Sequence, residues 1–282
     1  MHGPFDGMTG LVTGASDGLG RSLARALAAR GMTVAVAARR ADRLAALAAE
    51  IDGLGGPTAI PVAVDLTEPG AAAALAQQAI ERCGRVDVLV NNAGVLVSET
   101  MRDGDCQAAR ALFEVNYWSP VALTAALAPQ MGQGGMVVNI SSVAQHVPFP
   151  CYVFYGASKA GLSATTEAAR HEFSADGVSV VHVLLGQVGT AMYIQARAGA
   201  SPGARLVTRL GAPSPDRAAE VIANGMVRRK RRIVYPVSAQ FARRWPALTA
   251  RGVDAAQAVA RRVVRPTEVS CANPPARHSA AR

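Results

Sequence analysis

The sequence predicts an α/β fold in which a doubly wound parallel sheet carries helices on both faces. Three observations lead to this prediction. Short runs rich in β-branched residues alternate with Ala- and Leu-rich stretches over most of the 282 residues, which indicates repeated strand–helix–strand units. The strand segments are almost continuously apolar, as expected for strands covered on both faces. No internal repeat or linker interrupts the alternation, so one domain is expected.

The expected elements follow one another at regular spacing. Strands are expected at 10–13, 33–38, 59–64, 86–91, 136–140, 178–185 and 232–235. Helices are expected between them, at 18–30, 42–52, 68–83, 105–128, 151–174 and 215–227. Valine is frequent in the strand segments and suits a pleated, buried surface, whereas Ala, Leu and Arg in the helical segments have high helix propensity. The result is a Rossmann-like single domain.

Domain boundaries follow from composition. We expect the α/β domain at 1–237, a basic amphipathic helical extension at 238–265 and a disordered tail at 266–282. Residues 186–213, rich in Gly, Ala and Pro, are expected to form a flexible insertion.

Composition excludes several classes of protein. Half of the residues are hydrophobic and 17% are charged, unlike a disordered or collagen-like chain. No apolar run is long enough to span a membrane and the start has no signal-peptide pattern, so a cytoplasmic location is expected. The four cysteines are far apart in the sequence and form no Cys-x-x-Cys pair, which predicts neither a metal site nor a disulfide framework.

The net charge of +9 is unevenly distributed. Residues 1–225 contain 16 Lys or Arg and 18 Asp or Glu, whereas residues 226–282 contain 13 and 2. The basic part includes the run Arg228–Arg232, and then Phe241, Trp245 and Leu248 at helical spacing among Arg243, Arg244 and Arg251. This pattern predicts either peripheral contact with an anionic membrane or a terminal helix whose aromatic residues pack on the domain. No nucleic-acid recognition motif accompanies the charge, so no nucleic-acid partner is expected.

A glycine-rich segment, Thr13-Gly14-Ala15-Ser16-Asp17-Gly18-Leu19-Gly20, closes the first strand and opens the first helix. Glycines let backbone amides approach a pyrophosphate, and the helix N-terminus supplies partial positive charge. The spacing is Gly-x-x-x-Gly-x-Gly, which differs from the usual dinucleotide fingerprint.

Over about residues 7–237 the chain resembles the short-chain dehydrogenase/reductase family, whose cofactor motif has this spacing. Further motifs of the family follow in its order: Asp65, Asn91-Asn92-Ala93-Gly94, Asn116, Ser142 and Tyr155-Gly156-Ala157-Ser158-Lys159. One departure is Leu185-Gly186-Gln187-Val188-Gly189-Thr190, where the family usually begins with proline. Loss of the fixed proline φ predicts a more mobile loop.

The resemblance implies a catalytic set of Asn116, Ser142, Tyr155 and Lys159. Tyr155 and Lys159 are four residues apart on an expected helix, so their side chains share a face. A nearby ammonium is expected to lower the pKa of the phenol. Ser142, in preference to Ser141, would polarise the substrate carbonyl, and Asn116 would hold a water that relays protons to Lys159.

The resemblance also implies the cofactor contacts. Gly14, Ser16, Asp17, Gly18, Leu19 and Gly20 would surround the phosphates, and Asp65 the adenine. Asn92, Ala93 and Gly94 would follow the adenosine ribose, Tyr155 and Lys159 the nicotinamide ribose, and Gly186, Val188 and Thr190 the carboxamide. Thr190 is equally expected to cap the next helix. No metal ligands are expected.

Arg39, nineteen residues after Gly20, stands where NAD enzymes usually carry an acidic residue. Its guanidinium is suited to a 2′-phosphate, so NADP is expected and NAD is less favoured. Asp17 argues against this choice, because many NADP-preferring relatives have a basic residue there. The alternative is that Arg39 and Arg40 open a solvated helix that Asp42 caps.

These features predict an NADP-dependent oxidoreductase that interconverts a ketone or aldehyde with an alcohol. Met192, Tyr193 and Ile194 are expected to line a pocket for a hydrophobic substrate, whereas His146 would line it or be solvated. A sugar-nucleotide epimerase or dehydratase would need a longer chain. A non-catalytic dinucleotide-binding or membrane scaffold protein would tend to lose Tyr155 or Lys159. Family relatives form dimers or tetramers, so a homo-oligomer is implied.

Overall fold

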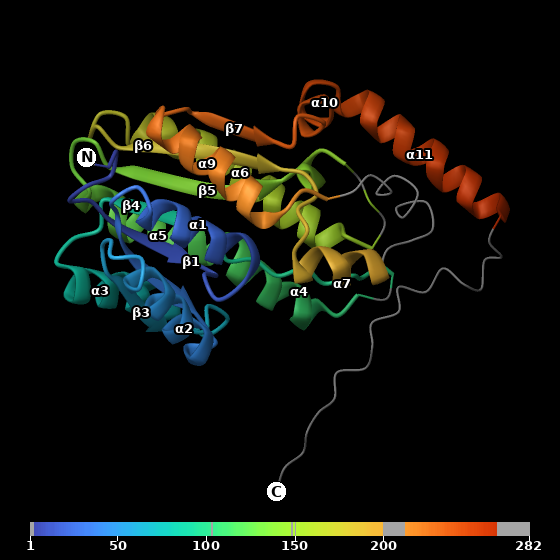
Figure 1. Cartoon of the computed structure of the whole chain (residues 1–282). Coiled ribbons are helices and arrows are strands. Elements are labelled where there is room, and N and C mark those ends of the chain that lie inside the picture. The colour runs from blue at the N-terminus through green and yellow to red at the C-terminus, as the bar shows by residue number, and fades with distance from the viewer. Residues whose placement is uncertain (1–2, 103, 148, 150, 200–211, 264–282) are drawn as a thin grey trace, which may run out of the picture.

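The computed structural model describes residues 3–102, 104–147, 149, 151–199 and 212–263, except for the side chains of 197–199 and 260–263. Its strands form one parallel sheet in the order β3-β2-β1-β4-β5-β6-β7 (Figure 1). The strands are β1 (Thr9–Thr13), β2 (Thr33–Ala38), β3 (Ala59–Ala63), β4 (Val88–Asn91), β5 (Met136–Ser142), β6 (Ser179–Leu185) and β7 (Arg232–Tyr235). The expected doubly wound parallel sheet is confirmed.

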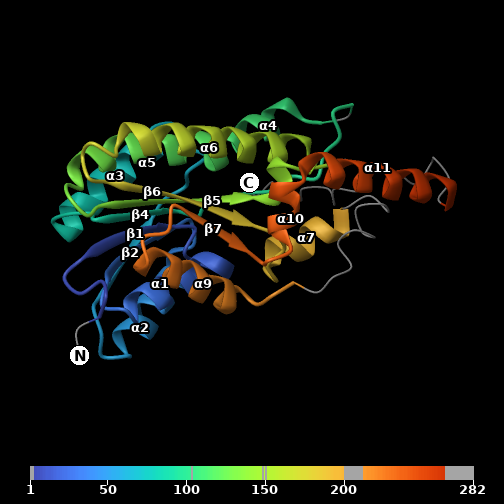
Figure 2. The same ribbon diagram turned by 90° about the horizontal axis from the view of Figure 1, so that it is seen from above.

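Helices cover both faces of the sheet (Figure 2). One layer contains α1 (Gly18–Ala28), α2 (Ala41–Asp52) and α9 (Pro215–Val227), and the other contains α3 (Ala71–Cys83), α5 (Ser119–Leu127) and α6 (Val153–Glu172). Each layer encloses its own apolar core. Leu11 of β1 belongs to the core under α3 and α5, whereas its neighbour Val12 belongs to the core under α1 and α2. Both faces are buried, so the strand segments are continuously apolar.

The order of the strands determines where a ligand can bind. β1 lies between β2 and β4, so the chain winds away from β1 in opposite directions on its two sides. Such a reversal opens a crevice beyond the carboxyl ends of the strands. The glycine-rich turn after β1, Asn92 after β4 and Ser142 at the end of β5 all lie at this edge.

The expected helix at 105–128 is interrupted. It consists of α4 (Cys106–Phe113), a π-helical turn (Glu114–Trp118) and α5, followed by a 3₁₀ turn (Ala128–Gln130). Pro120 lies in the first turn of α5, where its missing N–H costs no helical hydrogen bond. π-helical turns are frequent at functional sites, and this one carries Asn116.

The segment expected to be a flexible insertion contains a helix, α7 (Ala191–Gly199). The Thr190 hydroxyl accepts a hydrogen bond from Tyr193 N at 3.2 Å, so Thr190 does cap this helix. Residues 200–211 of the same segment lie outside the described residues.

After β7 the chain forms α10 (Ala239–Arg244) and α11 (Pro246–Val263), and α11 extends away from the sheet (Figure 1). Val253 is buried with Val147 and Ala242, but Phe241 is 55% and Trp245 50% exposed. Each of these aromatic side chains is thus about half covered, and both alternatives for this segment stay predictions. None of the described helices is long and apolar enough to cross a membrane. The expected tail at 266–282 lies outside the described residues.

Candidate active site

A cleft of about 930 Å³ opens at the carboxyl edge of the sheet. All of the expected cofactor-binding residues line it: Gly14, Ser16, Asp17, Gly18, Leu19, Gly20, Arg39, Asp65, Asn92, Ala93, Gly94, Tyr155, Lys159, Gly186, Val188 and Thr190. Ser142 lines it as well, whereas Asn116 does not. The fold thus brings residues between Gly14 and Thr190 of the sequence to one cavity.

The glycine-rich turn has no room for side chains. A Cβ on Gly20 would lie 2.3 Å from Gly14 O, and one on Gly14, which has φ +67°, would lie 2.8 Å from Ala93 Cα. The turn therefore packs directly on the segment after β4 and leaves the N-terminus of α1 facing the cleft. Asp17 caps α1, accepting a hydrogen bond from Gly18 N at 2.8 Å. This arrangement fits a pyrophosphate group, whose approach a Cβ would block.

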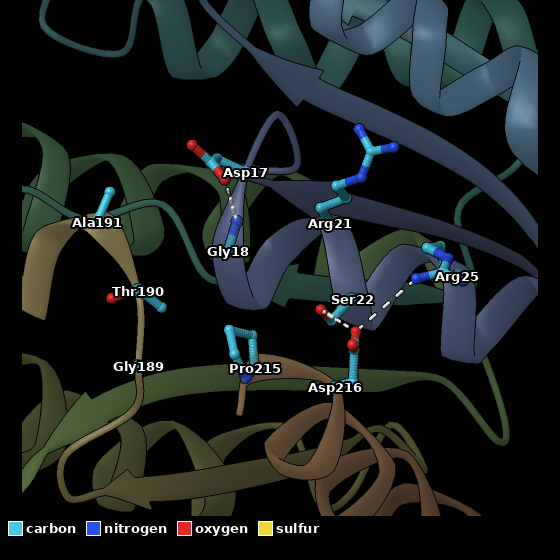
Figure 3. Close-up of a pocket in the computed structure, with 10 residues that line it drawn as sticks. All are labelled: Asp17, Gly18, Arg21, Ser22, Arg25, Gly189, Thr190, Ala191, Pro215 and Asp216. Atoms are coloured by element: carbon cyan, nitrogen blue, oxygen red, sulfur yellow. Dashed lines mark hydrogen bonds and ion pairs between the residues drawn. The ribbon is translucent and has the colours of Figure 1, made fainter. Parts of the chain in front are cut away.

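A smaller hollow of about 290 Å³ adjoins the cleft, where α1, α7 and α9 begin (Figure 3). Ser22 donates a hydrogen bond to Asp216 Oδ1 at 2.7 Å, which joins α1 to α9. A Cβ on Gly18 would lie 3.1 Å from Thr190 Cγ2. The loop before α7 thus lies directly against the glycine-rich turn, so the segments expected to hold the carboxamide and the phosphates are in contact.

The basic side chains at the end of β2 neutralise Asp17. Arg43 lies 2.9 Å and Arg40 3.4 Å from the Asp17 carboxylate. The hydrogen bond from Gly18 N, opposed by burial and reinforced by Arg40 and Arg43, holds the pKa of Asp17 below its usual value. The sequence analysis did not assign Arg40 or Arg43 to the site. Their positions one and four residues after Arg39, at the start of a helix, could have indicated that they lie near the same ligand.

Arg39 and Arg40 both line the cleft and are exposed. Arg39 lies 3.9 Å from Asp65 Oδ2, and Arg40 donates a hydrogen bond to Ser16 Oγ at 3.0 Å. Arg40, and not Asp42, occupies the N-cap position of α2, with no side-chain cap. The expectation that Asp42 caps this helix is wrong, because α2 begins one residue earlier and includes Asp42 in its first turn.

Lys159 is buried on α6, one turn after Tyr155. Its ammonium donates a hydrogen bond to Ile140 O at 2.9 Å, and no ion pair with an acidic side chain is found for it among the described residues. Burial lowers the pKa of Lys159 to about 8, because a charge loses hydration there.

The pKa of Tyr155 is raised, although a hydrogen bond with Ser142 partly opposes the effect of burial. The expected lowering by Lys159 is wrong in direction, because removal of the phenolate from water is the largest effect. At neutral pH Tyr155 is therefore a neutral phenol that can donate its proton.

The two consecutive serines at the end of β5 differ in environment. Ser142 caps the 3₁₀ turn Val143–Gln145, accepting from Ala144 N at 3.2 Å, and lines the cleft. Ser141 is buried, and its hydroxyl contacts Gln145 and Ser163. Both serines line the cleft, but these contacts occupy the Ser141 hydroxyl, whereas Ser142 is hydrogen-bonded with Tyr155.

Asn116 is fully buried in the π-helical turn. Its side chain pairs with the Val95 backbone, accepting from N at 2.8 Å and donating to O at 2.9 Å, and it also donates to Ser158 Oγ at 3.1 Å. Asn116 therefore joins the segment after β4 to α6. The expected water that relays protons to Lys159 stays a prediction, since these contacts occupy the amide.

The part of the cleft beyond Tyr155 is mostly apolar. Lining side chains there include Val143, Val147, Phe149, Tyr152, Met192, Tyr193, Ala196 and Ala242. Ile194 does not line the cleft and is 69% exposed, so that expectation is wrong: Ile194 lies on the outer face of α7. His146 is absent from the described wall and pairs with Gln145 at 2.8 Å.

The C-terminal helices also contribute to the cleft. Ser238, Ala239, Ala242 and Thr249 line it, and the sequence analysis assigned none of them to the site. No sequence signal distinguished them, because they are small residues brought to the wall by the packing of α10 and α11 beyond β7.

Comparison with known proteins identifies the family. The family model described as short chain dehydrogenase matches residues 9–201. The chain therefore belongs to the short-chain dehydrogenase family, as the sequence motifs predicted.

Particular relatives share the central part of the chain. A short chain dehydrogenase of Pseudocercospora fijiensis is 38% identical over 182 residues, which cover 63% of this chain and 59% of the relative. Dehydrogenase/reductase SDR family member 7B of Mus musculus is 36% identical, covering 66% and 59%. The 11-beta-hydroxysteroid dehydrogenase A of Sesamum indicum is 37% identical, covering 61% and 50%. The chain thus matches between half and three-fifths of the length of these relatives.

Solved structures show the same architecture. A short chain dehydrogenase from Burkholderia cenocepacia, in complex with NADP, has a TM-score of 0.75 at 27% identity, covering 84% of this chain and 99% of that one. A short-chain dehydrogenase from Sphingobium yanoikuyae, in complex with NADPH, has a TM-score of 0.74 at 29% identity, covering 93% and 98%.

Proposed function

We propose that this protein is an NADP-dependent oxidoreductase that interconverts a hydrophobic ketone or aldehyde with its alcohol. The observation that carries the proposal is the meeting of Ser142, Tyr155 and Lys159 in one cleft with the glycine-rich turn. The NADP-bound structures of similar proteins support the choice of cofactor.

The chain's own residues account for the chemistry of carbonyl reduction. The cofactor, when bound, supplies the hydride. Ser142 and Tyr155 would hold the substrate oxygen, and Tyr155 would donate its proton to that oxygen as negative charge develops. Such preorganised donors contribute about 3 kcal/mol each. The Lys159 ammonium, present below its pKa of about 8, would stabilise the resulting phenolate.

The apolar inner wall supports a hydrophobic substrate. Among the described lining residues, the acidic side chains are Asp17 and Asp65, both in the cofactor half. A cationic substrate would therefore lose hydration without an acidic partner in the apolar part of the cleft. The test is NADPH oxidation with β-tetralone, decanal and glucose as probes. Reduction of the first two is expected, and reduction of glucose alone would contradict the proposal.

We predict that NADPH binds at least about tenfold more tightly than NADH, a difference of roughly 1.4 kcal/mol. Arg39 and Arg40 face the cleft, Ser16 adds a hydroxyl, and Asp17 is neutralised. A guanidinium beside a 2′-phosphate forms strong charge-assisted hydrogen bonds. Arg39→Asp should reverse the preference, as measured by fluorescence titration with each cofactor.

The matched control for this prediction is Arg228→Asp, which makes the same charge change at an exposed residue outside the cleft. The control should retain the preference of the unmodified protein. Tighter binding of NADH than of NADPH by the unmodified protein would show that the cofactor assignment is wrong.

We also propose peripheral contact with anionic membranes through α10 and α11. Phe241, Trp245 and Leu248 are each at least half exposed at a spacing of four and three residues, and Arg243, Arg244 and Arg251 are exposed beside them. Apolar insertion and cationic attraction together suit an anionic lipid surface.

The basic run Arg228–Arg232 belongs to a different part of the molecule. It lies at the start of β7, whereas α10 follows the end of β7. Arg232 pairs with Glu167, and Arg229 donates a hydrogen bond to Gly134 O at 3.2 Å. β7 therefore separates the two groups of arginines along the chain.

This separation provides a controlled test. We predict that the protein co-sediments with phosphatidylserine-containing vesicles at low salt and that replacement of Arg243, Arg244 and Arg251 by Gln abolishes binding. Each basic residue near the surface contributes about 1 kcal/mol, an attraction that salt weakens. The matched triple substitution of Arg228, Lys230 and Arg231 by Gln should leave binding unchanged. Equal recovery of all three proteins in the supernatant would contradict the proposal.

A further inference from the structure

A chain of hydrogen-bonded side chains leads from the active-site edge into the layer between the sheet and α6. Ser141 Oγ, on β5, lies 2.7 Å from Gln145 Oε1 and 2.8 Å from Ser163 Oγ. Ser163, on α6, also contacts the Gln145 amide and lies 3.0 Å from His182 Nε2, on β6. His182 Nδ1 lies 3.1 Å from Glu167 Oε1.

The far end of this chain is fixed by charge. Glu167 forms ion pairs with Arg170 and Arg232. Hydrogen bonds from Arg232, Arg170 and His182 outweigh the effect of burial on Glu167 and lower its pKa to about 2. Glu167 is therefore a carboxylate, which can only accept hydrogen bonds.

Proton counting then gives the network a direction. Burial lowers the pKa of His182, so at neutral pH the ring has one proton, which it donates from Nδ1 to Glu167. Nε2 is then an acceptor, and Ser163 must donate to it. With its proton donated to His182, the Ser163 hydroxyl can accept from Ser141 Oγ but not from Gln145 Oε1, which is also an acceptor. Ser141 retains a proton to donate to the network or to Lys159 O, which lies 3.2 Å away.

The near end of the hydrogen-bonded network touches the segments that carry Ser142, Tyr155 and Lys159. Ser141 precedes Ser142 on β5, Gln145 ends the 3₁₀ turn that Ser142 caps, and Lys159 O belongs to α6, which also carries Tyr155. The turn is close to α6, since a Cβ on Gly156 would lie 3.0 Å from Ala144 O. The network therefore cross-links the strand, the turn and the helix.

We infer that Gln145, Ser163 and His182 are positioning residues that hold Ser142 at its working distance from Tyr155 and Lys159. The inference rests on the proposed oxidoreductase function. None of the three lines the cleft, so they act through Ser141 and the backbone of Lys159. A displacement of about 1 Å in such a group can reduce turnover by up to two orders of magnitude.

The decisive variant is Ser163→Ala, which removes the hydroxyl that joins Ser141 to His182. We expect kcat for NADPH-dependent reduction of β-tetralone to fall at least tenfold, with KM and the NADPH Kd within twofold. Ser163→Thr keeps a hydroxyl and should restore kcat. Thr165→Ala is the matched control, because Thr165 lies on the same helix but donates only to the backbone carbonyls of Gly161 and Leu162.

A second readout needs no substrate. Lys159 and Lys230 are the only lysines in the sequence, so ¹³Cε-lysine labelling gives two signals, which Lys230→Arg distinguishes. Lys159 should titrate with a pKa of about 8 in the unmodified protein. In Ser163→Ala, looser packing admits water and should move this pKa toward 10.5.

Unchanged kcat and an unchanged Lys159 titration in Ser163→Ala would overturn the inference and leave the network a purely structural role. If the unmodified protein reduces none of the probes, the proposed function fails, but the titration still decides whether the network positions Lys159. If Ser163→Ala does not fold, His182→Gln, which interrupts the same chain, serves for both measurements with the same expected results.

Discussion

Tyr155→Phe is expected to lower kcat for NADPH-dependent reduction of β-tetralone at least about a hundredfold. The phenol is the proposed proton donor, and burial keeps it neutral at neutral pH by raising its pKa. Phenylalanine keeps the ring and its packing but removes the proton and the bond with Ser142. General acid catalysis by one positioned group contributes two to four orders of magnitude. Steady-state kinetics on the purified variant measure the loss.

Cofactor binding distinguishes a chemical defect from a folding defect. Tyr155→Phe should bind NADPH with a Kd close to that of the unmodified protein, since the glycine-rich turn and the arginines are untouched. Tyr117→Phe is the matched control, because the Tyr117 ring packs on Trp118 outside the cleft. Near-normal turnover by Tyr155→Phe would show that another group supplies the proton.

Most of the fold could be predicted from the sequence because each strand is short, apolar and followed by a helix. The expected ranges at 33–38, 215–227 and 232–235 agree with β2, α9 and β7 to the residue. The break in the expected helix at 105–128 could not be predicted, because a π-helical turn depends on the tertiary contacts of Asn116 with Val95 and Ser158.

The site residues that belong to sequence motifs could be predicted. Those that reach the cleft only through tertiary packing could not. The cofactor residues lie in ordered motifs at strand ends, and all of them line one cleft. Ala239, Ala242 and Thr249 reach the same cleft only because α10 and α11 pack beyond β7. Ion pairs also could not be predicted from the sequence. The negative charge of Asp17 alone argues against NADP, but Arg40 and Arg43 balance that charge.

The protonation states of Tyr155 and Lys159 could not be predicted from the sequence either. Spacing shows that Tyr155 and Lys159 share a helix face, but burial decides their charge. The pKa of Tyr155 is raised and that of Lys159 is lowered to about 8. A neutral phenol beside an ammonium can donate a proton, as the proposed carbonyl reduction requires.

Lys159→Arg is expected to lower kcat by about two orders of magnitude, although it keeps a positive charge. Lys159 is only 4% exposed, and its Nζ lies 3.6 Å from where a Cβ on Gly94 would be. A planar guanidinium is larger, needs several acceptors and cannot replace a compact ammonium in this space. Its position relative to Tyr155 and the substrate oxygen should therefore change, and kinetics with β-tetralone measure the result.

The pH dependence of the unmodified enzyme provides the control for charge. Because the pKa of Lys159 is lowered to about 8, the ammonium is present below pH 8 and is lost as pH rises through that value. The rate of carbonyl reduction should therefore fall above about pH 8 in the unmodified protein. Arginine stays charged throughout this range, so the residual activity of Lys159→Arg should lack this decline. A fully active Lys159→Arg enzyme with an unchanged pH profile would mean that Lys159 only joins α6 to Ile140 of β5 and that a different group stabilises the Tyr155 phenolate.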